Sequence, residues 1–250
     1  MRPYSIFPLD YDPTSGGQKV MWALYGYLLS RGVIVNVNAK YNNPDFVAIY
    51  PEIMKNNPAE ANTVVRYILA PPGEMALYGT PGPSSFGEND RLYSFSKFIY
   101  KTDDEHTMFL PVIDTSLFND QGKKRTKSCY FIGKGTYTAV EPKGCIEVNR
   151  KFAQDQQMLA DFLNTCEVMY CYDFRTAMME VARLCGCRVV LISDKYPKEE
   201  YKNYEPGLNG VSFGMDEAKL LDTVAFTASY KALRRTFEDK LDTFILSTQK

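Results

Sequence analysis

The sequence predicts an α/β protein made of two open parallel-sheet units in tandem, followed by a helical tail. Apolar, strand-like runs alternate with amphipathic, helix-like runs twice, once in each half of the chain. The length agrees with this, because 250 residues suit one large domain or two small ones. Ligands of such sheets bind beyond the carboxyl ends of the strands, so we expect the two units to face each other across a ligand-binding cleft.

In the first half, the turn residues of 10–17 separate a short strand from a helix that ends at Gly32, a suitable C-terminal cap. β-Branched and apolar runs then predict two strands, and Pro-Pro-Gly at 71–73 stops a second helix. A weaker pattern follows, with one more strand. The expected elements are a strand at 4–9, a helix at 17–32, strands at 33–38 and 45–51, a helix at 57–73 and a strand at 90–100.

The second half repeats the alternation after the basic run KKRTK (123–127), which we interpret as a solvated linker. Short apolar runs rich in β-branched or aromatic residues predict strands, and helical spacing predicts the helices between them. From Asp216 the chain is expected to be helical, with one apolar stripe. The expected elements are strands at 128–133 and 145–149, a helix at 155–166, a strand at 167–172, a helix at 173–186, a strand at 187–193 and the stripe Phe237, Leu241, Phe244 and Ile245.

The composition argues against several classes of function. Hydrophobic residues make up 45% and charged residues 24%, as in an ordinary soluble protein, and a net charge of −1 gives no general attraction to nucleic acid. No apolar run approaches the ~20 residues of a membrane span, and the N-terminus lacks the apolar core of a signal peptide. We therefore expect a cytoplasmic protein without a transmembrane segment or a nucleic-acid partner.

Histidine and cysteine usage restricts the chemistry further. The one histidine, His106, lies in the polar run KTDDEH, which indicates a solvated loop and leaves no histidine-based metal site. Most of the six cysteines lie in apolar runs, which suits reduced, buried thiols. We interpret Cys185 and Cys187 as structural residues at a helix end and a strand start, and we expect no bound metal.

Three stretches stand in a particular order along the chain. Gly16-Gly17 opens a helix, FLPVIDTSLF (109–118) follows, and FIGKG…PKG precedes LADFLNTCEVMYCYDF…MEVARLCGCRVV. Together with IYPEIMKNNPAEANTVVRYILAPPG, they resemble nucleotide-sugar glycosyltransferases of the GT-B fold. The resemblance is to the retaining group that includes sucrose and glycogen synthases, in a small bacterial-type form.

The first stretch, in which Gly16-Gly17 opens a helix that ends at Gly32 before a strand, is similar to the family's N-terminal Gly-Gly loop. In 109–118, Asp114 and Phe118 keep the spacing of the family's Pro-Asn-Gly-Val-Asp-x-x-x-Phe junction, without its Asn-Gly. The third is similar to the family's Gly-Arg…Lys-Gly loop and its Glu-x7-Glu donor motif. Asp173 stands where the family has its first Glu, and Glu180 lies one step before the position of the second. The family's Gly-Phe-Gly loop is missing.

The resemblance implies a GT-B-like arrangement of two Rossmann-like domains facing a cleft. Residues 1–110 would form a reduced acceptor-side domain, because the chain is short for this fold. Residues 111–215 would form the nucleotide-sugar donor domain. Residues 216–250 would be a helical segment that packs back toward the N-terminal domain.

Transfer from a nucleotide sugar builds negative charge on the leaving diphosphate, which cationic side chains and helix N-termini can stabilise without metal. Lys134 and Lys143 lie at the two ends of a loop after a strand, where such cations are expected. Gly16 and Gly17 would let the backbone approach the phosphates. The structural alternatives are two solvated surface lysines and an ordinary strand-to-helix turn.

The resemblance implies that Glu180 accepts hydrogen bonds from ribose hydroxyls and that Asp173 lies near the transferred hexose, and these are the candidate catalytic residues. Arg175, in the same expected helical turn as Asp173, is a candidate for pairing with a phosphate or with Asp173. The structural alternatives are a helix N-terminal acid favoured by the macrodipole for Asp173, and a solvated helix face for Glu180.

The sequence thus predicts a hexosyltransferase that uses a nucleotide sugar and a glycan or lipid-linked acceptor, with no metal or other cofactor. Retention of configuration follows from the resemblance, and a lipid-linked acceptor leaves peripheral membrane contact open. The alternative is a non-catalytic scaffold of the same fold that binds a nucleotide or sugar in a cell-envelope or polysaccharide assembly complex. A third hypothesis is a nucleotide-sugar epimerase. Such enzymes rely on acid–base pairs that often include histidine, and this chain supplies little for such a pair.

Overall fold

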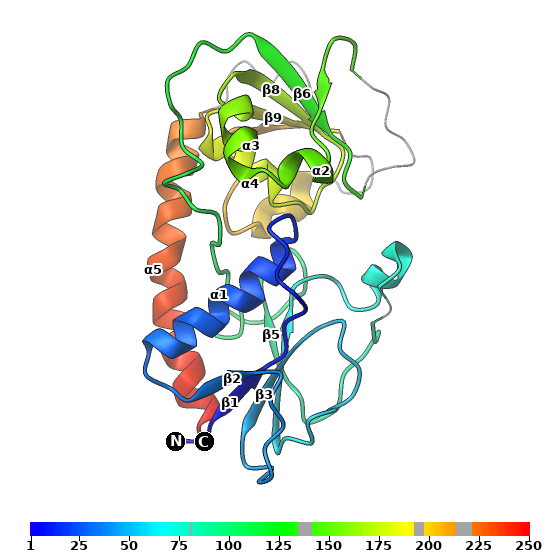
Figure 1. Ribbon diagram of the computed structural model, residues 1–250, viewed down its shortest axis with the longest axis vertical. Helices are drawn as coiled ribbons and strands as arrows, with labels where there is room; N and C mark the ends of the chain where they lie inside the picture. Colours follow the sequence, from blue (N-terminus) through cyan, green and yellow to red (C-terminus); the bar gives the residue numbers. More distant parts are fainter. Residues whose placement is uncertain (81, 135–141, 193–197, 214–221) are drawn as a thin grey trace. The chain divides into compact units, whose positions relative to one another are not determined.

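The computed structural model describes residues 1–250 except 81, 135–141, 193–197 and 214–221. The chain divides into two compact units, which we call unit 1 (Met1–Val112 with Leu233–Lys250) and unit 2 (Ile113–Ala232). Each unit holds one five-stranded sheet, and all strand pairings within these two sheets are parallel. The predicted class, an α/β protein with two parallel sheets and a C-terminal helix, is confirmed (Figure 1).

The sheet of unit 1 has the strand order β2-β1-β3-β4-β5. The chain moves from β1 to one neighbour and then crosses to the other side for β3, so the topological switch point lies between β1 and β3. All residues of β3 and β4 are buried, as expected for parallel strands that are covered on both faces. The strands are β1 (Tyr4–Ile6), β2 (Val35–Val37), β3 (Val47–Pro51), β4 (Thr63–Ile68) and β5 (Arg91–Ser94).

Two helices contribute to the core on one face of this sheet, α1 (Gly16–Ser30) and, from Leu233 onward, α5 (Thr223–Thr248). The Oγ of Ser15 caps α1 by accepting the N–H of Gln18 at 3.4 Å, and Gly32 follows the helix with φ 70°. The apolar stripes predicted from helical spacing both join this core. They are Val20, Met21, Leu24 and Leu28 on α1, and Phe237, Leu241, Phe244 and Ile245 on α5.

The other face of the sheet is covered by loops that a buried arginine holds in place. Arg66 on β4 is 2% exposed. Its Nε donates to Asp90 Oδ2 at 2.6 Å and its Nη1 to the carbonyl of Met54 at 2.9 Å, and its guanidinium stacks 4.9 Å from the ring centroid of Tyr50. The carbonyls and the carboxylate satisfy a cation that would otherwise be costly to bury.

The helix expected at 57–73 is wrong, because β4 occupies Thr63–Ile68 and pairs with β3 and β5. All residues of β4 are buried and its first three are β-branched, which favours a strand. Before it, Glu60 adopts φ 58°, which an α-helix does not allow. A strand that is buried on both faces lacks the period-2 pattern that distinguishes a strand from a buried helix.

The sheet of unit 2 has the order β10-β9-β8-β6-β7, which is the order of unit 1 read from the opposite edge. Its topological switch point therefore lies between β6 and β8. The strands predicted in this half are confirmed, and the short β10 was not predicted. The strands are β6 (Lys127–Phe131), β7 (Ile146–Glu147), β8 (Cys166–Cys171), β9 (Arg188–Leu191) and β10 (Val211–Ser212).

The helices of unit 2 are short. α3 follows the cap residue Asp155, whose Oδ1 accepts the N–H of Met158 at 2.8 Å, and α3 was predicted at this place. The first residues of the expected C-terminal helix, up to 221, lie outside the described residues. The helices are α2 (Arg150–Ala153), α3 (Gln156–Leu163) and α4 (Met178–Leu184), with the 3-10 helices η1 (Glu74–Tyr78) in unit 1 and η2 (Lys198–Asn203) in unit 2.

The basic run 123–127 is not simply a solvated linker. Arg125 donates from Nη2 to the carbonyl of Cys185 at 2.6 Å and to Asp120 Oδ1 at 2.7 Å, and from Nη1 to the carbonyl of Cys166 at 3.1 Å. Lys127 is the first residue of β6. Arg125 therefore ties the chain before β6 to the helix end after α4, whereas Lys124 remains exposed.

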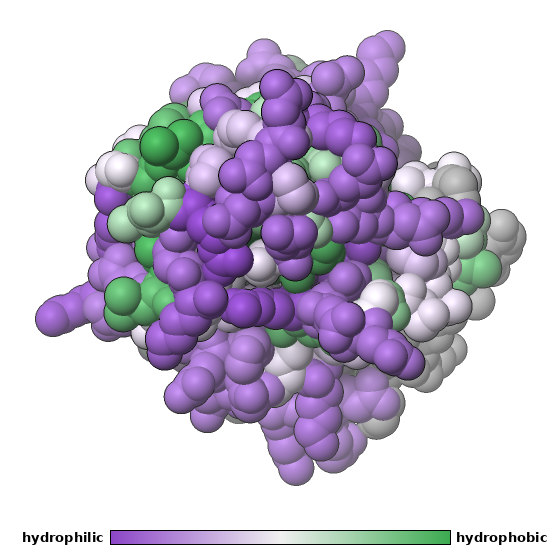
Figure 2. Space-filling model, turned by 90° about the horizontal axis from the view of Figure 1, so that it is seen from below, coloured by the Kyte–Doolittle hydropathy of each residue, from purple (hydrophilic) through white to green (hydrophobic). Residues whose placement is uncertain are grey.

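The molecular surface in Figure 2 is mostly hydrophilic, with apolar residues in small separate areas. Exposed apolar side chains such as Ile34 and Leu246 occur, which is normal for globular proteins. Within the described residues, no helix has the length and apolar character needed to cross a membrane.

All six cysteines are free thiols, five of them buried and Cys145 half-buried. Burial raises the pKa of the Cys185 thiol to about 12, so it is a poor nucleophile. We expect thiol titration in denaturant without reductant to return six free thiols per chain. A count of four would indicate a disulfide bond and would contradict this prediction.

Candidate functional site

The carboxyl edge of the unit 2 sheet brings together residues that the sequence predicted as a site. β6 and β8 are neighbours, and the switch point lies between them. Gly133 and Lys134 follow the end of β6, and Asp173 follows the end of β8. These residues are far apart in sequence, but the parallel pairing of Phe131 with Cys171 places both loops at one edge.

Asp173 joins the two loops directly. It is 4% exposed, and its Oδ2 accepts the backbone N–H of Lys134 at 3.1 Å. Its Oδ1 accepts the backbone N–H of Arg175 at 3.0 Å. The carboxylate therefore fixes the backbone on both sides of the switch point, as charge-assisted hydrogen bonds to N–H groups do.

Gly133 is required where the carboxylate approaches the β6 loop. It adopts φ 55°, and a Cβ atom at this position would lie 2.5 Å from Asp173 Oδ2 and 2.6 Å from Phe131 Cε1. No other residue type fits this contact without displacement of its neighbours. The glycine of the FIGKG run thus serves the packing of the loop against Asp173.

The helix expected at 173–186 begins later than predicted, at Met178. The carboxylate of Asp173 accepts the N–H of Arg175, two residues on, which favours a turn over a helical start. Asp173 and Arg175 therefore lie in the turn before α4 rather than in its first helical turn. The guanidinium of Arg175 stacks 5.0 Å from the ring centroid of Phe174.

Glu180 lies in the first turn of α4, but its carboxyl group is not on a solvated helix face. The residue is 8% exposed, and Oε1 accepts a short hydrogen bond from the hydroxyl of Tyr204. Burial raises the pKa of Glu180, while the hydrogen bond from Tyr204 and the charge of Arg183 act in the opposite direction.

Arg183, one turn after Glu180, connects α4 to the segment after η2. It is fully buried, and its Nη1 donates to the carbonyls of Gly207 at 2.8 Å and Asn209 at 3.0 Å. Its guanidinium lies 3.7 Å from the ring centroid of Phe226, a close cation–π contact. Burial lowers the pKa of Arg183, opposed by Tyr204 and Glu180.

Arg183 and Tyr204 were not predicted from the sequence. One signal was present: in MMEVARL, acid and base stand three residues apart in a run that is otherwise apolar. Such a spacing places both side chains on one side of a helix. A helix with apolar residues all round is a buried helix, so its charged residues need buried partners.

The two predicted lysines differ in their surroundings. Lys134 lies in the turn after β6, with its backbone N–H bound to Asp173. Lys143 is exposed in a turn before β7, the edge strand beside β6. Residues 135–141, which connect them, lie outside the described part of the chain.

Gly16 and Gly17 begin α1 in unit 1, and neither has a positive φ. A Cβ on Gly17 would meet Leu69 Cδ1 at 3.5 Å, an ordinary contact, so alanine would also fit the backbone here. Beside this contact, the N–H of Leu69 donates to Glu52 Oε2 at 2.9 Å, and Glu52 is 5% exposed. Glu52 directly follows β3 at the switch point of this sheet, and it was not predicted from the sequence.

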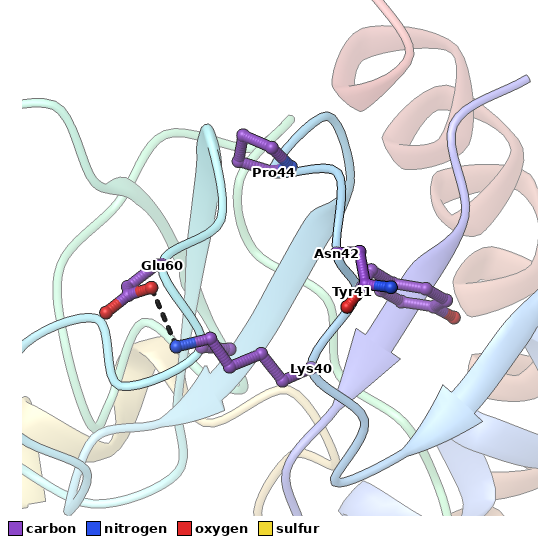
Figure 3. Close-up of a pocket in the computed structure, with 6 residues that line it drawn as sticks. Lys40, Tyr41, Asn42, Pro44 and Glu60 are labelled. Atoms are coloured by element: carbon purple, nitrogen blue, oxygen red, sulfur yellow. Dashed lines mark ion pairs between the residues drawn. The ribbon is translucent and has the colours of Figure 1, made fainter.

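A hollow of about 590 Å³ lies elsewhere in unit 1 (Figure 3). Its one ion pair joins Lys40 Nζ and Glu60 Oε2 at 2.7 Å, and both side chains are largely exposed. It contains none of the candidate residues, and we assign it no chemistry. The residues that line it are Lys40, Tyr41, Asn42, Pro44, Ala59 and Glu60.

In the part of the chain that the structure describes, no group of three or more His, Cys, Asp or Glu residues has the arrangement of a metal site. Lys134 and Arg175 lie in the two loops that the Asp173 carboxylate joins through their backbone N–H groups.

Comparisons with known proteins give matches among solved structures alone. No family model matches the chain, and no curated protein matches it. Among solved structures, spinosyn rhamnosyltransferase SpnG is similar over 97% of this chain and 96% of its own, with 12% sequence identity and a TM-score of 0.38. A similarity of that size carries no argument about fold or function.

Proposed function

We propose that the chain is a cytoplasmic glycosyltransferase of GT-B type, with unit 2 as its nucleotide-sugar donor unit and unit 1 as a reduced acceptor unit. One observation supports this most: the Asp173 carboxylate joins the loops of Lys134 and Arg175 at the switch point of the unit 2 sheet. Open parallel sheets bind their ligands at this position. The same loops resemble those of nucleotide-sugar glycosyltransferases, and this resemblance is the reason for proposing a nucleotide sugar as the substrate.

In this proposal, cationic groups stabilise the charge that develops on the leaving diphosphate. These cationic groups are the side chains of Lys134, Lys143 and Arg175, and no metal is needed. Gly16 and Gly17 offer backbone N–H groups at the start of α1, where a helix favours an anionic part of a ligand. Preorganised donors of this kind stabilise developing charge more strongly than water does.

The two acids have different tasks. Asp173 lies beside the transferred hexose and holds the backbone of the two loops in place. Glu180 accepts hydrogen bonds from the ribose. The acceptor is a glycan or a lipid-linked sugar, the latter with peripheral membrane contact, and retention of configuration is proposed on the resemblance alone.

The second candidate is a non-catalytic scaffold that binds a nucleotide or a sugar within a polysaccharide or cell-envelope assembly complex. The low exposure of both acids favours it, because Asp173 is 4% and Glu180 8% exposed. The scaffold binds a nucleotide or a sugar without reaction, and only the first candidate consumes a sugar donor. Release of nucleoside diphosphate from the sugar conjugate that binds best distinguishes them.

The first experiment is a thermal-shift panel of UDP, GDP, ADP and their sugar conjugates. A ligand at 100 times its dissociation constant adds about 2.7 kcal/mol of stability, so a specific nucleotide is readily identified. The absence of any shift at millimolar nucleotide would contradict the transferase and favour the scaffold.

We expect Lys134→Ala to weaken binding of the best nucleoside diphosphate by about 10- to 100-fold, since a hydrogen bond to a charged group is worth about 1.5–3 kcal/mol. Isothermal titration calorimetry measures this. Lys124→Ala removes the same charge from an exposed position of unit 2 and should bind like the wild type. If the two substitutions weaken nucleotide binding equally, Lys134 acts only through the overall charge of unit 2 and not through a contact with the ligand.

A further inference from the structure

The two oxygens of the Glu180 carboxyl group have different surroundings. Oε1 accepts the hydroxyl of Tyr204. Oε2 accepts no hydrogen bond from a described residue, and it is not among the fully enclosed polar atoms that lack a partner. Oε2 is therefore not fully enclosed, although the residue as a whole is only 8% exposed. A carboxylate has about four acceptor positions, so this oxygen retains its full capacity for a ligand.

Tyr204 is itself held in place by Arg183. Nη2 of Arg183 donates to the Tyr204 hydroxyl oxygen at 3.4 Å, and its guanidinium lies 5.8 Å from the ring centroid of Tyr204. The same guanidinium donates to the carbonyls of Gly207 and Asn209, and Nε donates to Met179 in α4 at 3.0 Å. The hydroxyl thus bridges a buried guanidinium and a buried carboxylate.

This bridge fixes the rotation of the Glu180 carboxyl group. Without the hydroxyl at Oε1, the carboxyl group could turn, and the charge of Arg183 would compete for both oxygens. With the hydroxyl in place, Oε1 is engaged and Oε2 is left as the acceptor for a ligand. A neutral phenol is suited to this task because it orients the carboxylate without neutralising it.

We propose that Tyr204, held by Arg183, is a positioning residue that aims Glu180 Oε2 at the ribose hydroxyls of a bound nucleotide. The inference rests on the proposed function and deepens it, because it names the residues that orient Glu180 for the ribose contact. The ribose hydroxyl donates to Oε2, and Tyr204 never contacts the ligand.

The test is calorimetric titration with three probes: the ribonucleoside diphosphate that binds best, its 2′-deoxy analogue and inorganic pyrophosphate. For the wild type we expect about 10-fold tighter binding of the ribo form than of the deoxy form, as for a hydrogen bond to a charged group. Tyr204→Phe should bring this ratio to about one to three and leave pyrophosphate binding unchanged. Glu180→Gln should also reduce the ratio.

Tyr201→Phe is the matched control. Tyr201 lies on η2 and is 1% exposed, its ring centroid lies 5.1 Å from that of Phe213, and the hydrogen bond to Glu180 comes from Tyr204 instead. The Tyr201→Phe variant loses a tyrosine hydroxyl from the same segment of the chain. It should keep the wild-type ratio between binding of the ribo form and of the deoxy form. A purely structural role for Tyr204 would weaken all three probes equally, and that result would overturn the inference.

Two further outcomes separate this inference from the proposed function. An unchanged ratio in Tyr204→Phe, with Lys134→Ala still weakening pyrophosphate binding, overturns the positioning role and leaves the transferase proposal standing. Failure of the wild type to bind any of the three probes overturns both. If Tyr204→Phe does not fold, the Glu180→Gln variant is used instead. Should that variant keep the wild-type preference for the ribonucleotide over its 2′-deoxy analogue, the inference is contradicted.

Discussion

Gly133→Ala is expected to lower the free energy of unfolding by about 2–5 kcal/mol and to abolish measurable nucleotide binding. Alanine at φ 55° costs about 1–2 kcal/mol in backbone energy. Its Cβ would also lie 2.5 Å from Asp173 Oδ2 and 2.8 Å from Asp173 Cβ, and overpacking of this kind costs about 1–3 kcal/mol. Relief of the contact must displace the carboxylate, and with it the N–H groups of Lys134 and Arg175.

Urea denaturation followed by circular dichroism measures the change in stability, and calorimetry measures the binding. Gly122→Ala is the control, because Gly122 has φ 63° and nothing lies within 4 Å of the position of its Cβ. Gly122→Ala should lower the free energy of unfolding only by the backbone cost of about 1–2 kcal/mol and should leave nucleotide binding intact. If Gly133→Ala behaves like this control, the contact between Gly133 and Asp173 does not position the loops.

The sequence predicted the fold class because local patterns and the final topology agree for most elements. The stripe of Val20, Met21, Leu24 and Leu28 predicted α1 and its buried face. β4 was mistaken for a helix because a strand buried on both faces carries no alternation. The error arises because the burial of β4 depends on the tertiary fold, and a short stretch of sequence does not show which of its residues the fold buries.

The candidate site was predicted in part. That Lys134 and Asp173 meet follows from a topological rule, since both residues follow strands of one parallel sheet. The partners of Glu180 did not follow from any rule of spacing. Tyr204 reaches it from a segment with little regular structure, and only the fold brings the two together. A side chain predicted as solvated was therefore found in a buried network.

Arg183→Leu is expected to lower the free energy of unfolding by about 3–5 kcal/mol at neutral pH. Removing one member of a buried, hydrogen-bonded charge cluster leaves the other charge uncompensated. Here Glu180 would remain buried with its hydrogen bond from Tyr204 alone, and the carbonyls of Gly207 and Asn209 would lose their donor. Arg188→Leu is the control, because its pair with Glu167 is partly exposed and should be worth about 0–1 kcal/mol.

The loss caused by Arg183→Leu should depend on pH. Burial raises the pKa of Glu180 above its usual 4.5, and the charge of Arg183 limits this rise. Without Arg183 the pKa of the folded state rises further. The folded state then binds more protons than the unfolded state between the two pKa values, so stability falls as the pH rises through that window. The deficit should be smallest below pH 4.5 and largest at neutral pH.

Adding Glu180→Gln to Arg183→Leu tests the assignment of this pH dependence. The amide cannot ionise, so the double variant should regain stability at neutral pH and lose the pH-dependent part of the deficit. Urea denaturation of the two single variants and the double variant between pH 4 and pH 8 completes the cycle. A deficit that is equally large at every pH would mean that the three carbonyl partners of Arg183, and not the charge of Glu180, account for its contribution.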